Sequence, residues 1–223
     1  MATETYNLKR VSDSAFIVNK DGKNEYNLQR VNGYWTCTCT GYYYRGTCKH
    51  LDMLKGKVSD SEIGSVDEVH TNGEIEKIKK SLDETVQEYD YTLSGDYRRG
   101  ADVVTSLPII VQADEKMFGM FISKLDGERF KATLKDTNVV RGYFDRVPTI
   151  FMRTDRSNFA TTLLTTTGGK DENARLRNIA KIKGWKLVEN GLFDGNGVQI
   201  QTVTEKDVYE KLGEKYKEPN DRS

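Results

Sequence analysis

The alternation of apolar and polar residues near the start of the chain predicts short β-strands. Apolar residues are frequent in residues 15–18 and 25–31, and an Asn-Gly pair separates the second run from residues 34–36. An Asn-Gly pair between such runs is a strong signal for a β-hairpin. Residues 49–54 have the pattern of one or two helical turns. We therefore expect a small β-rich module with a short helix at its end.

A helical period appears after residues 58–73, a polar stretch that is typical of a linker. From Glu74 onward, apolar residues recur at intervals of three and four up to Val86, which predicts an amphipathic helix. Residues 171–183 have the same period and predict a second long helix. Runs rich in apolar and β-branched residues predict strands at 109–111, 118–123, 129–134 and 139–144. This mixture of helices and strands predicts an α+β fold.

The composition is that of a globular chain with a modest core. Of its 223 residues, 36% are hydrophobic and 30% are charged, and 34 Lys and Arg balance 34 Asp and Glu. Because the net charge is zero, any surface for an anionic partner must be local. No apolar run is long enough to span a bilayer, and residues 1–10 have no signal-peptide core. We expect no membrane partner and an intracellular location, in the cytoplasm, nucleoid or nucleus.

All three cysteines lie in one short segment together with a histidine, as Cys37, Cys39, Cys48 and His50. Three thiolates and one imidazole make a closed tetrahedral set that is typical of structural zinc and leaves no open position for catalysis. An odd number of cysteines argues against a disulfide framework. We predict one structural Zn²⁺; the alternative is three free thiols and an exposed histidine that lie together by coincidence. The other histidine, His70, is in a polar stretch and is expected to be a solvated loop residue.

The CxC and CxH spacings, with Trp35 just before the first cysteine, resemble the SWIM zinc finger over residues 5–57. This resemblance implies binding to DNA or to protein and does not say which. Residues 1–57 contain nine Lys and Arg against five Asp and Glu, a mild excess that could meet phosphates. In the loop between the cysteine pairs, Tyr43 and Arg45 are candidate contacts to unpaired bases. The alternative is that these tyrosines pack on the zinc module or are merely exposed.

A Gly-Asp-Tyr-Arg-Arg-Gly turn lies between the helix that begins at Glu74 and the strand at 109–111. Such a turn, opening toward a helix N-terminus, can present backbone N–H groups and guanidinium to a phosphate. The segment resembles the phosphate-binding turn of family X DNA polymerases, which implies phosphate contacts for Arg98 and Arg99. In that family a serine usually follows the glycine. Here the residue is Asp96, an anion that argues against nucleotide binding.

The same resemblance implies three metal-binding aspartates, and none is found at its place. Residues 106–108 read Ser-Leu-Pro where the family has Asp-x-Asp, and the third aspartate falls on Pro148 or Ile150. Two-metal phosphoryl transfer needs carboxylates around both cations. The acids near enough in sequence to replace them are Asp102, Asp114, Asp145 and Asp155. A nucleotidyltransferase with relocated metal ligands therefore stays an alternative.

From residue 158 to the end, the chain resembles the family X thumb continuously. A Thr-Thr-Thr-Gly-Gly segment at 165–169 takes the place of Tyr-Phe-Thr-Gly-Ser, whose aromatic pair senses the sugar of the incoming nucleotide. The resemblance implies minor-groove contacts for Asn173 and Arg177, which detect duplex geometry more than sequence. Lys181 and other basic neighbours favour a phosphate-facing surface. For Arg177, a simple solvent-facing role is the alternative.

The sequence thus predicts four parts: a SWIM-like zinc finger (1–57), a linker (58–73), a nucleotidyltransferase-like palm with a mixed sheet and helices (74–165), and an α/β thumb (166–223). The lyase and fingers regions of family X are expected to be absent, with the zinc module in their place. The small chain and trimmed core suggest a virus or other mobile element as the source, and hence a location inside a host cell.

We predict a pseudoenzyme that grips duplex, nicked or gapped DNA without catalysis. It would act as an accessory or regulator in replication, repair or transcription. A protein-interaction subunit that docks on a nucleic-acid enzyme complex is the first alternative. The nucleotidyltransferase with relocated ligands is the second.

Overall fold

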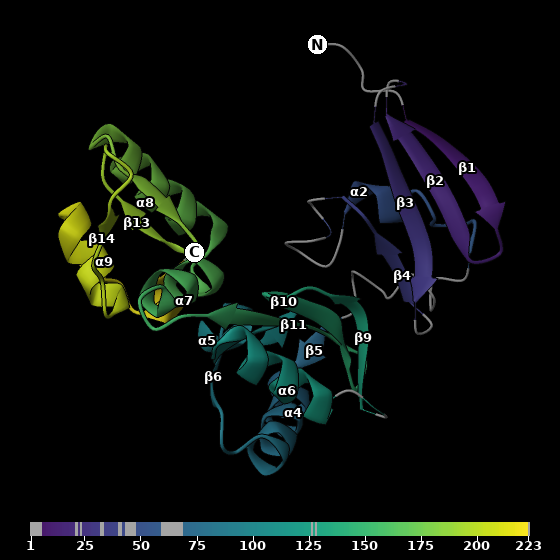
Figure 1. Ribbon diagram of the computed structural model, residues 1–223, viewed down its shortest axis with the longest axis horizontal. Coiled ribbons are helices and arrows are strands. Elements are labelled where there is room, and N and C mark those ends of the chain that lie inside the picture. Colours follow the sequence, from purple (N-terminus) through teal and green to yellow (C-terminus); the bar gives the residue numbers. More distant parts are fainter. Residues whose placement is uncertain are drawn as a thin grey trace.

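The structure is a computed structural model that describes residues 6–20, 22, 24–31, 34–39, 42, 48–58, 69–125, 127 and 129–222. Within these residues, four strands come first and mixed runs of helices and strands follow, and hydrophobic side chains gather in three clusters. In Figure 1, the N-terminal sheet lies at the upper right of the central sheet and the C-terminal helices lie at its upper left. Among the described helices, none has the length and apolar content needed to cross a membrane. The predicted α+β fold class is confirmed.

The N-terminal module is a four-stranded antiparallel sheet in the order β1-β2-β3-β4. Its elements are β1 (Tyr6–Ser12), β2 (Ala15–Lys20), β3 (Asn24–Val31), β4 (Tyr34–Cys37) and the one-turn helix α2 (Lys49–Asp52). One sheet face buries Phe16, Leu28 and Trp35 against the cysteines. The predicted strands and hairpin pairing are confirmed, although the Asn-Gly turn lies outside the described residues. Strand β1 was not predicted because it is a largely exposed edge strand that contains Lys9 and Arg10 and lacks a clear apolar alternation.

The central sheet has five strands in the order β6-β8-β11-β10-β9. In that order they are β6 (Asp90–Leu93), β8 (Leu107–Gln112), β11 (Val147–Thr154), β10 (Val139–Phe144) and β9 (Phe130–Lys135). Strands β8 and β11 are parallel and the other pairs antiparallel, so the sheet is mixed. Helices α4 (Asn72–Thr85) and α6 (Glu115–Leu125) cover one face (Figure 1). Their apolar sides, with Leu82 and Phe121, meet Phe151 of the sheet in the largest core.

Residues 118–123 form the middle of helix α6, so the prediction of a strand there is wrong. The segment is rich in aromatic and β-branched residues, and this composition favoured a strand. Phe118, Phe121, Ile122 and Leu125 recur at helical spacing and are all buried against the sheet. The helical period of the buried positions, rather than local composition, therefore decided the structure.

His70 is only 3% exposed, so the expectation of a solvated loop residue is also wrong. It lies in β5 (His70–Thr71), which pairs with β7 (Val103–Val104). Helix α4 begins directly afterwards because Thr71 caps it: Thr71 Oγ1 accepts from Glu74 N at 3.3 Å, and the Glu74 carboxylate accepts from Thr71 N at 2.7 Å. This capping box starts the helix two residues before Glu74.

The C-terminal part packs three helices around a small sheet. Its elements are α7 (Phe159–Thr167), α8 (Lys170–Ile182), β12 (Lys186–Val188), β13 (Gly191–Phe193), β14 (Gln199–Ile200) and α9 (Glu205–Leu212). Leu164, Leu176 and Tyr209 bring the three helices together in a core of their own. The predicted helix at 171–183 is confirmed, and its C-terminus is followed by Gly184 with a φ of +72°.

A buried carboxylate fixes the orientation of α8. Glu172 accepts hydrogen bonds from Arg175 Nη2 at 2.7 Å, from Tyr209 Oη at 3.0 Å and from Lys217 Nζ at 2.9 Å. It thereby joins α8 to α9 and to the C-terminal segment. These hydrogen bonds, that of Arg175 foremost, lower the pKa of Glu172 to about 2 against the opposing effect of burial.

We expect Glu172→Gln to lower the free energy of unfolding by about 1–3 kcal/mol at neutral pH. The folded-state pKa of about 2 lies below the ordinary value of 4.5, so the stabilisation is complete above pH 4.5 and is lost as the pH falls toward 2. Urea unfolding of both proteins across this range measures the difference. A gap between the two that does not shrink on acidification would contradict this role for Glu172.

Candidate metal centre and nucleic-acid interface

The four predicted metal ligands come together between β4 and α2. Cys37 ends β4, Cys39 follows it, and Cys48 and His50 lie at the start of α2. Their ligand atoms all lie within 4.8 Å of one another, and all four side chains are buried. A tetrahedral zinc ion, bound at about 2.3 Å to sulfur and about 2.0 Å to nitrogen, places its ligand atoms roughly 3.3–3.8 Å apart. A small inward movement of these side chains would therefore complete the set.

The chemistry of the donor set also fits a divalent metal. A hydrogen bond to Cys48, reinforced by burial, raises the pKa of the Cys37 thiol, and the same bond lowers the pKa of Cys48. Burial is the main cause that raises the pKa of Cys39. Three neighbouring thiols cannot all ionise here without a cation to compensate their charge. The Cys3His cluster could hold one metal ion.

Neighbouring groups hold these ligands in place. Backbone N–H groups donate to two of the sulfurs, from Cys39 to Cys37 Sγ at 3.4 Å and from Tyr42 to Cys39 Sγ at 3.3 Å. The His50 ring stacks on Tyr26, with centroids 4.2 Å apart. Such outer contacts orient metal ligands and are typical of structural sites.

The positions that the resemblance assigns to the family X aspartates meet on the face of the central sheet that lies opposite α4 and α6. In β8, alternate residues such as Ile109 enter the core under the helices, so Pro108 lies on the opposite face. Pro108 is paired with Ile150 of β11, which is in turn paired with Arg141 of β10. Pro148, the other candidate for the third aspartate, is paired with Tyr143 on this face.

A guanidinium, rather than a group of carboxylates, is buried on this face. Arg141 is 3% exposed and shares a small cavity with Ser106, Pro148 and Ile150. Both candidates for the third aspartate position therefore border it.

The four aspartates considered as replacement metal ligands do not form a cluster on this face. Asp114 accepts from Met117 N at the start of α6, Asp145 is paired with Arg129, and Asp155 lies 3.1 Å from Arg153. Asp102 lies in a bend before β7. Across the described part of the chain, the Cys3His group is the single cluster of three or more Cys, His, Asp or Glu side chains with metal-binding geometry.

The predicted phosphate-binding turn forms the short helix α5 (Gly95–Arg98), and Pro108 packs directly on it. A Cβ at residue 95 would lie 2.8 Å from Pro108 Cδ, so only glycine fits here. Arg99 donates to the Thr167 carbonyl at 2.5 Å and is paired with Asp96. The Asp96 carboxylate thus meets the guanidinium that the resemblance assigned to a phosphate.

Arg98 is held by a carboxylate of the thumb. Its Nη2 and Nη1 donate to Glu205 Oε2 at 2.6 Å and Oε1 at 2.9 Å, and Nη1 donates to Thr167 Oγ1 at 2.8 Å. Arg222 Nη1 reaches the same carboxylate at 2.6 Å. Burial by itself would raise the pKa of Glu205, but the hydrogen bonds from Arg98 and Arg222 outweigh it and lower the pKa. Sequence reasoning missed Glu205 as a partner of Arg98 because the two residues are far apart along the chain.

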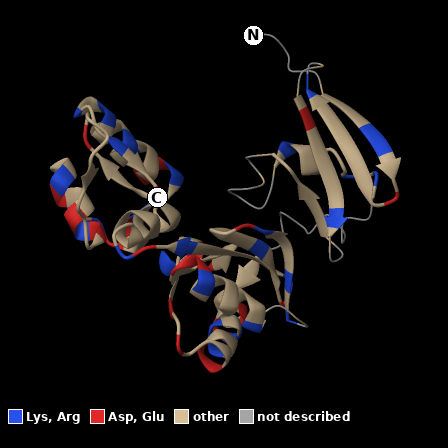
Figure 2. Cartoon of the chain, in the orientation of Figure 1, with Lys and Arg blue, Asp and Glu red and all other residues tan. Residues whose placement is uncertain are grey.

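Of the predicted thumb residues, Asn173 makes a hydrogen bond within the protein, whereas Arg177 and Lys181 are exposed. Asn173 Nδ2 donates to the Thr165 carbonyl at 2.7 Å, so this amide closes the turn between α7 and α8. Arg177 and Lys181 are exposed one turn apart on α8. They line an open groove together with Lys186, and Figure 2 shows basic residues along this helix.

Two further predictions concern loop and neighbouring residues. Tyr43 and Arg45 lie outside the described residues, so their proposed base contacts stay predictions. Arg175, a basic neighbour on α8, is paired with Glu172 and with Glu214 at 2.5 Å. It therefore contributes less to a basic surface than its position in the sequence suggested.

Comparison with known proteins agrees with this architecture. Residues 162–223 match the DNA polymerase beta thumb family. DNA polymerase lambda of Arabidopsis thaliana is 24% identical over 209 residues, which cover 78% of this chain and 38% of that protein. DNA polymerase lambda of Rattus norvegicus is 39% identical over 77 residues, 30% of this chain and 13% of that protein. The chain thus spans well under half the length of these relatives.

Similar solved structures show the fold over most of the chain. A ternary gap complex of Leishmania infantum polymerase beta has a TM-score of 0.67 and 18% identity, covering 82% of this chain and 84% of that one. A ternary P/T complex of the same protein has a TM-score of 0.65 and 17% identity, covering 82% and 92%. In its fold and in the match of residues 162–223, the chain resembles family X polymerases.

Proposed function

We propose that this protein holds duplex, nicked or gapped DNA without catalysing nucleotide transfer, as an accessory or regulator in replication, repair or transcription. The observation that carries the proposal is the positive charge on the palm face opposite α4 and α6. Arg141 is buried there beside Ser106 and Pro148, at the place where carboxylates would hold two cations. A guanidinium repels the divalent cations that two-metal phosphoryl transfer requires.

The surroundings of the α5 turn support the absence of nucleotide binding. Arg98 and Arg99 are already paired with Glu205 and Asp96, both within the protein. A triphosphate would have to displace Asp96 or bind beside it, at a cost in electrostatic repulsion. In this proposal the turn supports the fold and binds no substrate.

The thumb supports binding to DNA. Arg177, Lys181 and Lys186 gather along one open groove although the whole chain has no net charge. A local basic groove of this kind can meet backbone phosphates without reading sequence. The relatives are DNA polymerases, and the similar solved structures are gap and P/T complexes.

We assign one structural Zn²⁺ to the Cys3His cluster, held by the side chains of Cys37, Cys39, Cys48 and His50. The SWIM-like finger at 1–57, the linker, the palm at 74–165 and the thumb from 166 are parts of the same proposal.

Binding to DNA is tested by fluorescence anisotropy with gapped, nicked and single-stranded DNA across a salt series. We expect the double variant Arg177→Ala/Lys181→Ala to lose about tenfold in affinity at low salt, and its salt slope to fall by about 1–2, because two phosphate contacts are lost. Lys211→Ala, on α9, is the matched control and should bind as the parent protein does. A parent affinity no better than about millimolar for every DNA would overturn the proposal, since ordinary non-specific binders reach about 10⁻⁴–10⁻⁶ M.

Removing the internal anion should expose Arg99. We expect the parent protein to bind no nucleoside triphosphate measurably by calorimetry, and Asp96→Ser to bind it at about millimolar strength through the freed guanidinium. Asp145→Ser removes a comparable ion pair elsewhere and should bind none. The parent protein and both variants should incorporate no labelled nucleotide with Mg²⁺ or Mn²⁺. Incorporation by the parent that is lost in Asp102→Asn would instead favour an enzyme with relocated ligands.

The metal assignment predicts one zinc ion per chain by elemental analysis, and a cobalt derivative with the absorption of a three-sulfur, one-nitrogen tetrahedral site. Cys48→Ala should lose the metal. Lys49→Gln, between two ligands, should keep it. A protein purified under reducing conditions that binds no zinc with added metal would refute the assignment.

A further inference from the structure

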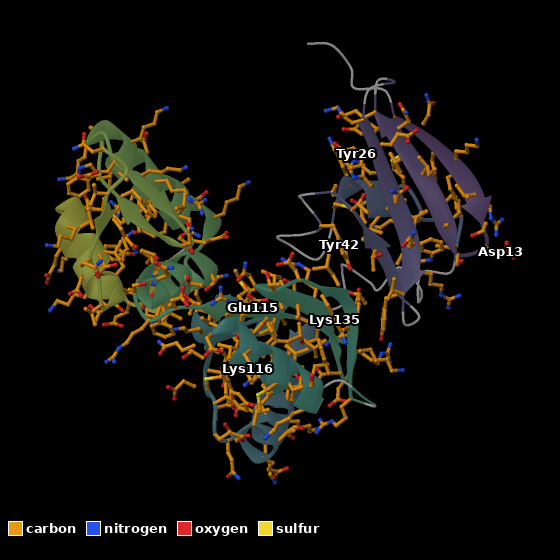
Figure 3. The ribbon with its side chains drawn as sticks, viewed as in Figure 1. Asp13, Tyr26, Tyr42, Glu115, Lys116 and Lys135 are labelled. Carbon is orange, nitrogen blue, oxygen red and sulfur yellow. The ribbon has the colours of Figure 1, made fainter. Side chains whose placement is uncertain are left out.

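The N-terminal module rests through two tyrosines on the palm face that lies opposite α4 and α6. Tyr34 of β4 stacks on Tyr143 of β10, with ring centroids 3.6 Å apart and planes inclined by 12°. The Tyr42 hydroxyl lies 3.2 Å from Thr133 Oγ1 of β9. Figure 3 places Tyr42 between the module and the central sheet. These contacts join elements that are about a hundred residues apart in the chain.

Tyr42 is attached at its other end to the Cys3His centre. Its backbone N–H donates to Cys39 Sγ at 3.3 Å, and its ring is buried in the same apolar cluster as Cys37 and Cys48. The side chain is only 2% exposed. A single residue therefore connects a metal ligand to the palm sheet.

The hydrogen bond between the Tyr42 hydroxyl and Thr133 has a defined donor and acceptor. Thr133 Oγ1 donates its proton to the Arg141 carbonyl at 3.4 Å, so the Tyr42 hydroxyl is left to donate to Thr133. Tyr42 also borders the small cavity that contains Arg141, Ser106 and Pro148. It thus covers the part of the palm where family X polymerases would hold their cations.

We propose that the metal of the Cys3His centre, acting through Tyr42, fixes the N-terminal module on the palm and keeps this face closed. This inference rests on the metal site of the proposed function. A metal bound by both Cys39 and Cys48 closes the segment between them. Metal binding therefore restricts the conformations of this segment, and positioning Tyr42 on the palm costs less additional entropy. Without the metal, the segment that carries Tyr42 is no longer closed between Cys39 and Cys48, and the module separates more readily from the palm. With the metal bound and the module docked, this palm face is not available to DNA.

Acetylation of Tyr143 by N-acetylimidazole, followed by peptide mass spectrometry, measures the separation. Tyr143 is covered by Tyr34, so its modification rate follows the fraction of undocked protein. We expect chelation of zinc to raise this rate at least tenfold. In zinc-loaded protein, Tyr42→Phe and Thr133→Val should each raise it about fivefold, which is the effect of one buried hydrogen bond of about 1 kcal/mol.

The control variant and residue separate this effect from unfolding. Thr137→Val, in the turn between β9 and β10, should leave the rate unchanged, and Tyr209 in the thumb core should stay unmodified throughout. Both tyrosine and threonine variants should retain one zinc ion per chain. If zinc-loaded Tyr42→Phe and Thr133→Val react at the parent rate, the connection is wrong even if chelation raises the rate.

The result is independent of the test for DNA binding. Rates that change as expected in a protein that binds no DNA would overturn the proposed function and keep this connection. Unchanged acetylation rates in a protein that binds gapped DNA would overturn this connection and keep the proposed function. A chain that binds no zinc would remove the basis of both the metal assignment and the connection.

Discussion

At the boundary between palm and thumb, the carboxylate of Glu205 lies between the guanidinium groups of Arg98 and Arg222, and it is only 6% exposed. Removing the Glu205 carboxylate would leave two guanidinium groups without their counter-charge, at a cost of about 3–5 kcal/mol. The three residues belong to the α5 turn, the start of α9 and the C-terminal segment, so their contact fixes the thumb against the palm. The groove along α8 is lined by thumb residues, so this contact sets its position relative to the palm.

In a polymerase site, metal ions supply positive charge and the nucleotide supplies negative charge. We propose that side chains of this protein supply both. Arg141 occupies the palm face in place of divalent cations, and Asp96 meets Arg99 in place of a phosphate. The Asp96 carboxylate satisfies the Arg99 guanidinium, which would otherwise be crowded without a counter-charge. On this proposal the palm and thumb stay folded without cations or nucleotide at the palm face, and the exposed side of α8 remains available to DNA.

Local spacing was enough to predict the metal ligands and the helix at 171–183. The CxC and CxH pattern places its four donors within a few residues of one another, and the helical period marks the buried side of α8. Contacts between distant segments left no such signal. The partnership of Arg98 with Glu205 and the stacking of Tyr34 on Tyr143 arise only when separate elements pack together. For residues 118–123, the neighbouring sheet decided between helix and strand.

The central claim is that the palm face holds no catalytic cation pair. Electron paramagnetic resonance of Mn²⁺, titrated into the zinc-loaded protein with gapped DNA and nucleoside triphosphate, tests this most directly. We predict only the spectra of free, DNA-bound and triphosphate-bound Mn²⁺ that the same mixture gives without protein, with no protein-dependent site near β8 and β11. Two coupled Mn²⁺ ions about 3.5–4 Å apart, lost when the nearby acids are replaced, would contradict it.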